Sequence, residues 1–420
     1  MKSISLMSDS RTERCPADAE YQGPSGTKYR LTLLKESGEL NRYRSDWQDL
    51  ASRTADPNPF YEDWFFLPAV KYLGGTEEWR LLLIHADLPK RSPNPSLVGF
   101  FPFVKSRNAC RVPEWRMWKN DFCYLTSPLV AKENTTDVLR AVMYYLRTEH
   151  ADTAILDFPL MCGEGALHHA FTEVLRENLS TTYLPDQYLR AMTTCREAPE
   201  EYLKSILGGH HVREYRRKRR KLEALGQLEY RLLDDSRGAD CWINWFLDLE
   251  ANGWKARAGT AIKLHPDQSR FFREMVENGL RNRQVQLEGL FLNGEPIALK
   301  CLLLARPAAF AFKIAFDEAH HTCSPGVQLE FQSLEQLART PDILSCDSCA
   351  IPGHQMIDRI WSERRLVRHL KISTGSVCGD LSLGALPFLR SINRVRKRWL
   401  ESSSSRKNGD ASSLPSDKSS

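Results

Sequence analysis

The sequence predicts a mixed α/β protein built from two similar units in tandem. Its 420 residues exceed what one ordinary hydrophobic core covers, so we expect two domains flanked by tails. At 42% hydrophobic and 26% charged residues, its composition is that of a globular protein. Each half shows the same order of elements: antiparallel strands, a helix, and a short strand that carries an aspartate before a proline. Sheets with helices on their faces accommodate this order.

The first half supplies one copy of this order. Apolar segments at 78–88 and 96–107 are typical of strands, and a proline-rich turn joins them. The segment 135–150 has the periodicity of an amphipathic helix. A short buried strand follows at 153–160 and carries Asp157.

The second half repeats this order of strands and helices with a different amino-acid sequence. Residues 284–305 read as strand, Asn-Gly turn and strand, and a further strand is expected at 309–317. A helix at 326–340 and a short strand at 342–353 with Asp347 complete the copy. We favour duplication of one α/β unit; two unrelated α/β layers remain the alternative, because the halves share few letters.

Composition shifts suggest the domain bounds. The chain ends are polar, and the last twenty residues are rich in serine and too poor in apolar residues to bury a core. We therefore expect a disordered tail at 1–27, a first unit at 28–200, a basic linker helix at 201–232, a second unit at 233–400 and a disordered tail at 401–420.

Charge and cysteine usage exclude several protein classes. A net charge of +5 is too mild at this length to imply a nucleic-acid partner. The eleven cysteines are scattered without a disulfide framework, which indicates a reducing, cytoplasmic compartment. We expect no leader peptide and no transmembrane segment, because the start lacks an apolar stretch and no run of about 18 apolar residues occurs.

One loop carries an unusual concentration of specific residues. The segment 249–262, LEANGWKARAGTAI, resembles the Leu-Glu-x-x-Gly-Trp-Lys-Gly-x-x-Gly-Thr-Ala signature of FemAB-like acetyltransferases of the GNAT superfamily, in the group named CelD-like cellulose-biosynthesis proteins. It departs at Ala256, where the signature has glycine and more room for close backbone approach. Further matching pieces follow the family order at 58–70, 213–230, 294–304, 312–330 and 347–365.

The resemblance implies two GNAT-like acyltransferase units joined by a basic helix. It further implies acyl-CoA-dependent transfer, of acetyl in the first place, to an amine or hydroxyl of a carbohydrate or small molecule, with exopolysaccharide or cellulose biosynthesis as the setting. The donor would be acetyl-CoA, without a metal. An aminoacyl-tRNA-dependent FemAB-type transferase is one alternative, and only there is a nucleic acid expected. A catalytically inactive interaction protein of a polysaccharide assembly is the other.

The start of the helix at 326–340 is the candidate donor site. Ser324 as N-cap and Pro325 in the first turn make a favourable helix start, and a helix N-terminus suits phosphate. The residue types alone also fit a strand-to-helix connection that binds no ligand. GNAT enzymes hold the coenzyme A pyrophosphate at the equivalent place, so the resemblance assigns cofactor binding to Ser324, Gly326, Val327 and Gln328.

Candidate catalytic groups lie beside this helix start. Lys313 and Asp317 share one face of a strand with period two, as an ion pair or to position an acceptor. A carboxylate or histidine can take the proton that acylation of an amine releases. His354 is therefore a third candidate, although a turn histidine with one backbone hydrogen bond is the favoured alternative. Trp361, Glu363 and Arg364 are expected in a family helix beyond it.

The signature loop supplies the candidate substrate-binding residues Trp254, Lys255 and Arg257, with packing of Trp254 in the core as the alternative. The basic run at 213–221 suits nucleic acid or anionic lipid, but we favour a solvated linker helix. Cys346 and Cys349 resemble half of a zinc or redox site, and we favour a core role because no second pair has metal spacing.

Overall fold

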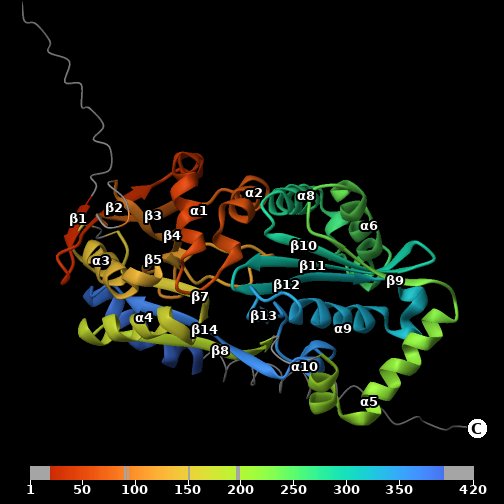
Figure 1. Cartoon of the computed structure of the whole chain (residues 1–420). Coiled ribbons are helices and arrows are strands. Elements are labelled where there is room, and N and C mark those ends of the chain that lie inside the picture. The colour runs from red at the N-terminus through yellow and green to blue at the C-terminus, as the bar shows by residue number, and fades with distance from the viewer. Residues whose placement is uncertain (1–18, 89–90, 92–93, 150–151, 195–198, 392–420) are drawn as a thin grey trace, which may run out of the picture.

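The computed structural model describes residues 19–88, 91, 94–149, 152–194 and 199–391. Within these residues, fourteen strands form one mixed sheet in the order β1-β2-β3-β4-β5-β7-β14-β8-β13-β12-β11-β10-β9, with β6 paired to β4. Figure 1 shows this sheet running through the whole molecule. The predicted α/β class with mixed sheets is confirmed.

The first unit begins earlier than the predicted tail allows, because residues 19–22 form a strand that pairs with β2. Its elements are β1 (Ala19–Gln22), β2 (Lys28–Leu34), η1 (Ser37–Tyr43), α1 (Arg44–Ser52), η2 (Pro59–Tyr61), α2 (Asp63–Leu73), β3 (Trp79–Ala86), β4 (Ser96–Arg107), β5 (Pro113–Met117), β6 (Leu129–Val130), η3 (Lys132–Asn134), α3 (Thr135–Thr148), β7 (Ile155–Cys162), α4 (Gly165–Glu177) and β8 (Thr182–Thr193).

A long helix, α5 (Pro199–Glu223), leads to the second unit. The elements of that unit are β9 (Leu228–Leu233), α6 (Ala239–Ala251), α7 (Trp254–Arg257), η4 (Ile262–Leu264), α8 (Pro266–Arg281), β10 (Val285–Leu292), β11 (Glu295–Ala305), β12 (Ala308–Phe316), η5 (Glu318–Cys323), α9 (Pro325–Ala338), β13 (Ser345–Asp347), α10 (Ile357–Ile360) and β14 (Glu363–Ser373).

The two units repeat one order and exchange their last strands. From β2 to β8, and again from β9 to β14, the main elements run strand, two helices, three antiparallel strands, helix, strand, helix and strand. The last strand of the second unit, β14, pairs with β7 of the first unit, while β8 of the first unit pairs with β13 of the second. Strands β8 and β14 also pair with each other. Each unit therefore needs the other to complete its sheet.

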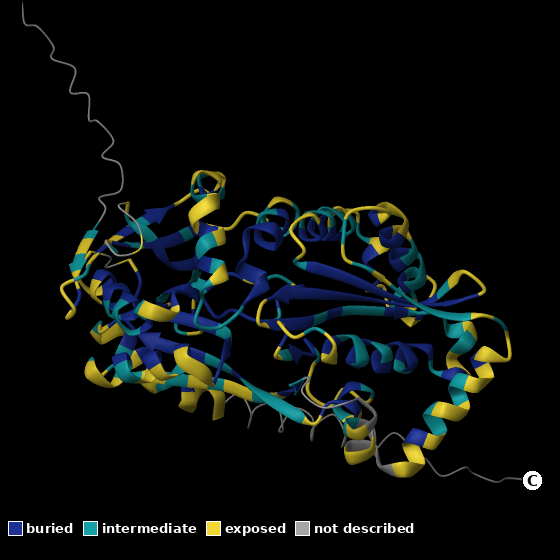
Figure 2. Ribbon diagram, viewed as in Figure 1, coloured by how far each residue is buried: buried dark blue, intermediate teal, exposed yellow. Residues whose placement is uncertain are grey.

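Hydrophobic burial explains the layers. Every residue of β10 is buried, as expected for a strand covered on both faces. Figure 1 shows α6 and α8 on one face of β9–β12 and α9 on the other, and α9 contacts β10 and β11. Figure 2 shows these strands buried, whereas α5 is mostly exposed, as expected for a solvated connecting helix.

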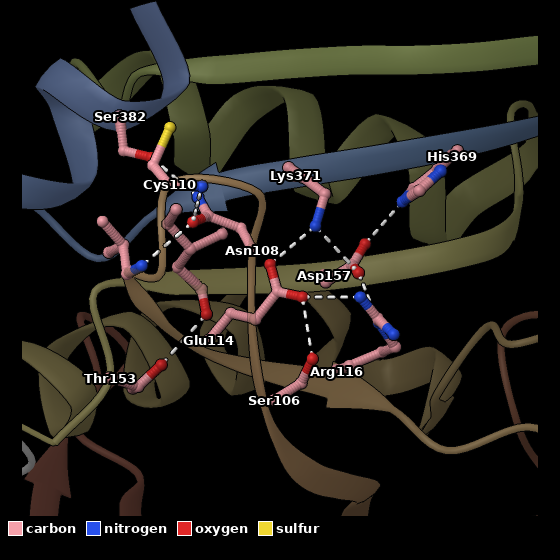
Figure 3. Close-up of polar contacts among 12 residues, drawn as sticks. Ser106, Asn108, Cys110, Glu114, Arg116, Thr153, Asp157, His369, Lys371 and Ser382 are labelled. Carbon is pink, nitrogen blue, oxygen red and sulfur yellow. Dashed lines mark hydrogen bonds and ion pairs between the residues drawn. The ribbon is translucent and has the colours of Figure 1, made fainter. Parts of the chain in front are cut away.

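Two buried aspartates anchor β14 in the sheet. They are the two that the sequence places in equivalent strands: Asp157 in β7 and Asp347 in β13. Lys371 of β14 lies 2.9 Å from Asp157 and 2.6 Å from Glu114 of β5, and Asp157 also accepts from His369 at 2.6 Å (Figure 3).

The charge network around these anchors is fully buried at its acidic members. Glu114 and Asp157 are at most 1% exposed, and Arg116 closes the network with 2.7 Å contacts to both (Figure 3). Farther along β14, Arg365 donates to Asp347 at 2.8 Å. The strand that arrives last in the chain is thus fixed by charges from both units.

One expected feature differs from the structure, and a second agrees with it. The segment beyond His354 was expected to be a helix, but only residues 357–360 are helical. Glu363 and Arg364 begin strand β14, where they pair with Met192 and Ala191 of β8. Cys346 and Cys349 are buried, and the described residues contain no group of three or more possible metal ligands, in keeping with the favoured core role.

Candidate functional site

A gap opens in the second unit where β12 and β13 diverge. These parallel strands pair over only three residues, from Ala308 with Ser345 to Phe310 with Asp347. Beyond Phe310, β12 has no strand partner on this side among the described residues. A diverging parallel pair followed by a helix gives a ligand access to the middle of the sheet.

The equivalent gap in the first unit is closed. There β5 and β7 also pair over three residues before they diverge. The loop after β5 fills the space: Thr126 donates to the carbonyl of Leu160 at 2.7 Å, and Ser127 Oγ accepts from the backbone of Cys162 at 3.0 Å. Both loop residues are fully buried. In the second unit, no described loop makes backbone hydrogen bonds of this kind to residues 311–316 of β12.

A cavity of about 330 Å³ lies at the start of α9, within the size range of ligand sites. Helices α5, α9 and α10 enclose it. Its rim is basic, with Lys218, His211 and Arg359 against a single acid, Glu214, which is paired with Arg217 at 2.7 Å. Its full lining is His211, Glu214, Tyr215, Lys218, Ser324, Val327, Gln328, Phe331, Gln355, Met356, Arg359 and Ile360.

Three of the four predicted cofactor-binding residues, Ser324, Val327 and Gln328, line this cavity. The fourth, Gly326, is buried against β12: a Cβ there would approach the ring of Phe316 to 3.2 Å. Glycine thus lets the helix start lie close to the strand.

The helix start offers fewer free N–H groups than the sequence suggests. Pro325 has none, and the N–H groups of Val327 and Gln328 return to the carbonyl of Ser324 at 3.0 and 3.1 Å. Ser324 adopts the left-handed conformation with φ +52° and makes no side-chain cap. Its hydroxyl instead accepts from Lys218 Nζ at 3.0 Å. Side-chain cations, rather than a row of N–H groups, therefore give this end its positive field.

Gln328 leaves a hydrogen-bonding group unused in the cavity wall. The side chain is 1% exposed, its Nε2 donates to the carbonyl of Tyr215 at 3.2 Å, and its Oε1 has no partner among the residues that the structure describes. An unsatisfied buried acceptor is unfavourable.

Lys313 lies on the other face of the sheet, where the two units meet. Its ammonium is 4.8 Å from the ring centroid of Phe122 and 6.0 Å from that of Tyr124, both in the loop after β5. Burial, and then repulsion from Lys255, lowers the pKa of Lys313 from 10.5 to about 8. A lysine tuned this way holds an appreciable neutral fraction near neutral pH.

Asp317 does not pair with Lys313. Its Oδ1 accepts from the backbone of Ala319 at 2.9 Å, and its Oδ2 lies 3.8 Å from His320. The expected ion pair fails because β12 ends at Phe316 and Asp317 turns to cap the short helix η5. A catalytic role for Asp317 stays a prediction that this geometry does not support.

The signature loop is tied to the end of β12. Lys255 bonds to buried Glu250 at 2.7 Å and to the carbonyl of Ile314 at 3.2 Å. Glu318 accepts from the backbone of Trp254 at 2.6 Å and from Arg257 at 2.8 Å. Lys255 and Arg257 are therefore both engaged within the protein.

Trp254 is 54% exposed, so the alternative of core packing does not hold. The cavity it borders has a volume of about 20 Å³, room for about one water molecule and not for a substrate. Substrate contact by Trp254, Lys255 and Arg257 stays a prediction. The departure at Ala256 is tolerated, because that residue lies inside the helical turn α7.

His354 is exposed and accepts a hydrogen bond from the backbone of Ile357 at 3.3 Å, which is the turn role that the sequence favours. The cavity-lining residues that the sequence reasoning missed include Lys218, Tyr215 and Arg359. The basic run at 213–221 contains Lys218, but the sequence does not show which of its basic side chains faces α9.

Residues 209–348 match the family described as Acetyltransferase (GNAT) domain. Among solved structures, the chain is similar to FemX at 11% identity, over 82% of this chain and 98% of that chain, with a TM-score of 0.52. No curated protein matches the sequence.

Two weaker structural similarities carry a lower TM-score. One is a tandem GNAT protein from the clavulanic acid biosynthesis pathway, at 14% identity, 82% and 99% coverage and a TM-score of 0.40. The other is the C-terminal domain of a putative lysylphosphatidylglycerol synthetase from Agrobacterium fabrum, at 11% identity, 83% and 97% coverage and a TM-score of 0.47. Of these three similarities, we therefore use only the one to FemX as evidence of a shared fold.

The matched GNAT domain runs from within α5 to the end of β13, and the first unit repeats the order of the elements in the second. Residues 209–348 thus match a GNAT-type acetyltransferase domain, and the chain as a whole shares the fold of FemX. The narrower likeness to CelD-like proteins stays a prediction. Among the described helices, none has the length and apolar character that crossing a bilayer requires.

Proposed function

We propose that this protein is an acyl-CoA-dependent acyltransferase that transfers an acyl group, acetyl in the first place, to an amine or hydroxyl of a carbohydrate or small-molecule acceptor. The observation that carries the proposal is the basic-rimmed cavity of about 330 Å³ at the start of α9, the helix that follows β12. An open polar cavity at this place favours an enzyme over an interaction protein with a filled cleft.

The cavity offers a separate contact to each part of an acyl-CoA. Lys218 and Arg359 supply positive charge for phosphates. Gln328 Oε1, unpartnered and buried, supplies an acceptor for an amide N–H of the pantetheine arm. The arm then leads the thioester into the gap beyond Phe310, where β12 has no partner strand on that side among the described residues.

Lys313 is positioned to serve the acceptor from the opposite face. Ile314 and Phe316 face Gly326 and the donor side, whereas Lys313 faces Phe122 and Tyr124. In the reaction, the acceptor nitrogen or oxygen bonds to the thioester carbonyl carbon, the C–S bond breaks, and coenzyme A leaves as a thiol. Neutral Lys313 takes the proton that the acceptor loses, because a base with pKa near the working pH is effective.

A second candidate is transfer from an aminoacyl-tRNA. The observation that favours it is the exposed basic face of α5, which flanks the same cavity with Arg213, Arg220 and Lys221. Basic side chains on one helix suit a phosphate backbone, and such binding weakens steeply with salt.

Calorimetry with acetyl-CoA and desulfo-CoA tests the proposal. We expect one site on the folded chain and binding about 10- to 100-fold weaker in Lys218→Ala, because a charge-assisted hydrogen bond contributes about 1.5–3 kcal/mol. Lys221→Ala is the matched control: it removes the same charge from the same helix outside the cavity. Lys313→Ala should bind the donor normally, since its role is in the transfer step. Absence of binding by the wild type, with charged tRNA bound instead, would support the second candidate.

A further inference from the structure

A second cavity, with a volume of about 370 Å³, lies between α4 of the first unit and the strands β8 and β14. Its wall on α4 includes residues 168, 171, 172 and 175, which share one face of the helix because side chains three and four positions apart are neighbours. It shares no lining residue with the cavity at the start of α9. None of its lining residues is acidic, and six are apolar: Met161, Phe171, Leu175, Leu179, Leu184 and Leu370.

Two of these apolar side chains are exposed to solvent. Leu179, just after α4, is 90% exposed, and Leu184 of β8 is 45% exposed. Exposed apolar side chains that gather at one place mark a ligand or partner site more often than single ones do. An aliphatic chain seated among them would leave water, which strengthens binding about fourfold for each methylene buried.

A half-buried arginine adds a positive charge to this apolar cavity. Among the residues that the structure describes, no carboxylate pairs with Arg368 of β14; its Nη1 donates instead to Nε2 of His168 at 3.1 Å. Because a guanidinium only donates, Nε2 accepts and the ring of His168 is neutral. Burial, and then repulsion from Arg368, lowers the pKa of His168, in agreement with a neutral ring. Arg368 is thus a cation in the cavity wall without a counter-ion, an unfavourable state that a bound anion relieves.

We propose that this cavity binds an aliphatic carboxylic acid of medium chain length, with its carboxylate on Arg368 and its chain among the leucines. The two oxygens of a carboxylate match the paired N–H groups of a guanidinium. An uncharged chain would leave Arg368 without a counter-ion, and an acidic peptide would bring polar backbone groups against apolar side chains. The volume lies at the lower end of the range for ligand sites, which suits a chain of medium length.

A bound acid would also connect the two units. Arg368 and Leu370 belong to the exchanged strand β14, whereas the other lining residues belong to the first unit. A ligand that binds only the folded chain stabilises it, so octanoate at ten times its Kd should raise the unfolding temperature by about 3–6 °C. The site is independent of the acyl donor and holds whichever donor the second unit binds.

Calorimetric titration of the full chain with octanoate, hexanoate and octanol tests the proposal. We expect one site for octanoate. Hexanoate should bind about tenfold more weakly, because it lacks two methylenes. Octanol should bind about 10- to 100-fold more weakly than octanoate, because it has no charge to pair with Arg368.

Two variants separate the charge from the apolar walls. Arg368→Gln should bind octanoate about 10- to 100-fold more weakly and octanol as the wild type does. Leu184→Asp brings a like charge into the lining and should weaken octanoate binding at least tenfold; because Leu184 is exposed, its thermal unfolding should match the wild type. Leu189→Asp is the matched control: this leucine of the same strand is 56% exposed, lies outside the lining, and should leave octanoate binding unchanged.

Three results would overturn the proposal. One is a folded wild type that does not bind octanoate, or that binds octanoate and octanol equally well. Another is octanoate binding that Arg368→Gln and Leu184→Asp both leave unchanged. The third is a wild-type dimer that Leu184→Asp dissociates, since a second copy of the chain would then cover the leucines.

Discussion

Replacing Lys313 by methionine should stabilise the protein while removing its transfer activity. The side chain is largely buried, faces the rings of Phe122 and Tyr124, and has no carboxylate partner among the described residues; its ammonium is repelled by Lys255. Methionine has a similar length and fills the same space without a charge. A residue retained at the expense of stability in this way is typical of functional sites.

The magnitude follows from the pKa. A fall from 10.5 to about 8 means that the folded state disfavours the charged lysine by about 3 kcal/mol at pH 7. Loss of the aromatic contacts offsets about 1 kcal/mol of this. We therefore expect Lys313→Met to raise the free energy of unfolding by about 2 kcal/mol, or the unfolding temperature by about 2–4 °C.

The pH dependence of the free energy of unfolding is a second test of the sign of this effect. Between pH 8 and 10.5 the unfolded chain keeps a proton on Lys313 that the folded chain has lost, so wild-type stability rises with pH in this window. The advantage of Lys313→Met should thus be full below about pH 8 and shrink toward pH 10. Calorimetric unfolding of both proteins at a series of pH values measures it.

Lys255→Met is the matched control and should have the opposite sign. Lys255 pairs at 2.7 Å with Glu250, which is 3% exposed, so its loss leaves a buried carboxylate without its cation and costs about 3 kcal/mol. If Lys313→Met destabilises the protein as Lys255→Met does, at every pH, the description of Lys313 as a strained, unpaired lysine is wrong.

Three other predictions concern the exchanged strands. Lys371→Met should lower the free energy of unfolding by about 3–5 kcal/mol in urea, because two buried carboxylates lose their cation, whereas Lys105→Met at a partly exposed pair should change it by at most about 1 kcal/mol. Although burial opposes ionisation, His369 and Lys371 hold the pKa of Asp157 well below 3.8. Its contribution is therefore complete above about pH 5 and falls as the pH drops below 4, and Asp157→Asn should flatten the urea midpoint in that range. The fragment 28–200 should not unfold cooperatively alone, since it lacks β14; a sharp thermal transition of that fragment would contradict the exchange.

Local patterns sufficed for much of the fold. The hairpin at the Asn293-Gly294 turn, the helices near 135 and 326, and the strands with Asp157 and Asp347 all follow from periodicity and turn residues. The exchange of β8 and β14 could not be predicted this way. It depends on pairings between strands more than 150 residues apart, such as Val367 with Tyr188, and on the charges that meet only after folding.

The candidate site divides in the same way. The sequence places Ser324, Val327 and Gln328 at one helix start, and the structure shows that all three line one cavity. The basic side chains of the cavity come from α5 and α10. The sequence alone does not show that these two helices pack beside the start of α9. Conversely, the sequence predicts that Lys313 and Asp317 lie on one face of the same strand. In the structure β12 ends at Phe316, one residue before Asp317. Asp317 therefore caps the next helix, while Lys313 faces the first unit.

The most direct test of the donor assignment is titration of the folded wild-type chain with acetyl-CoA by isothermal calorimetry. The proposed site predicts one micromolar site that weakens in Lys218→Ala and not in Lys221→Ala. Absence of binding, or binding that both variants leave unchanged, would contradict an acyl-CoA site at the start of α9.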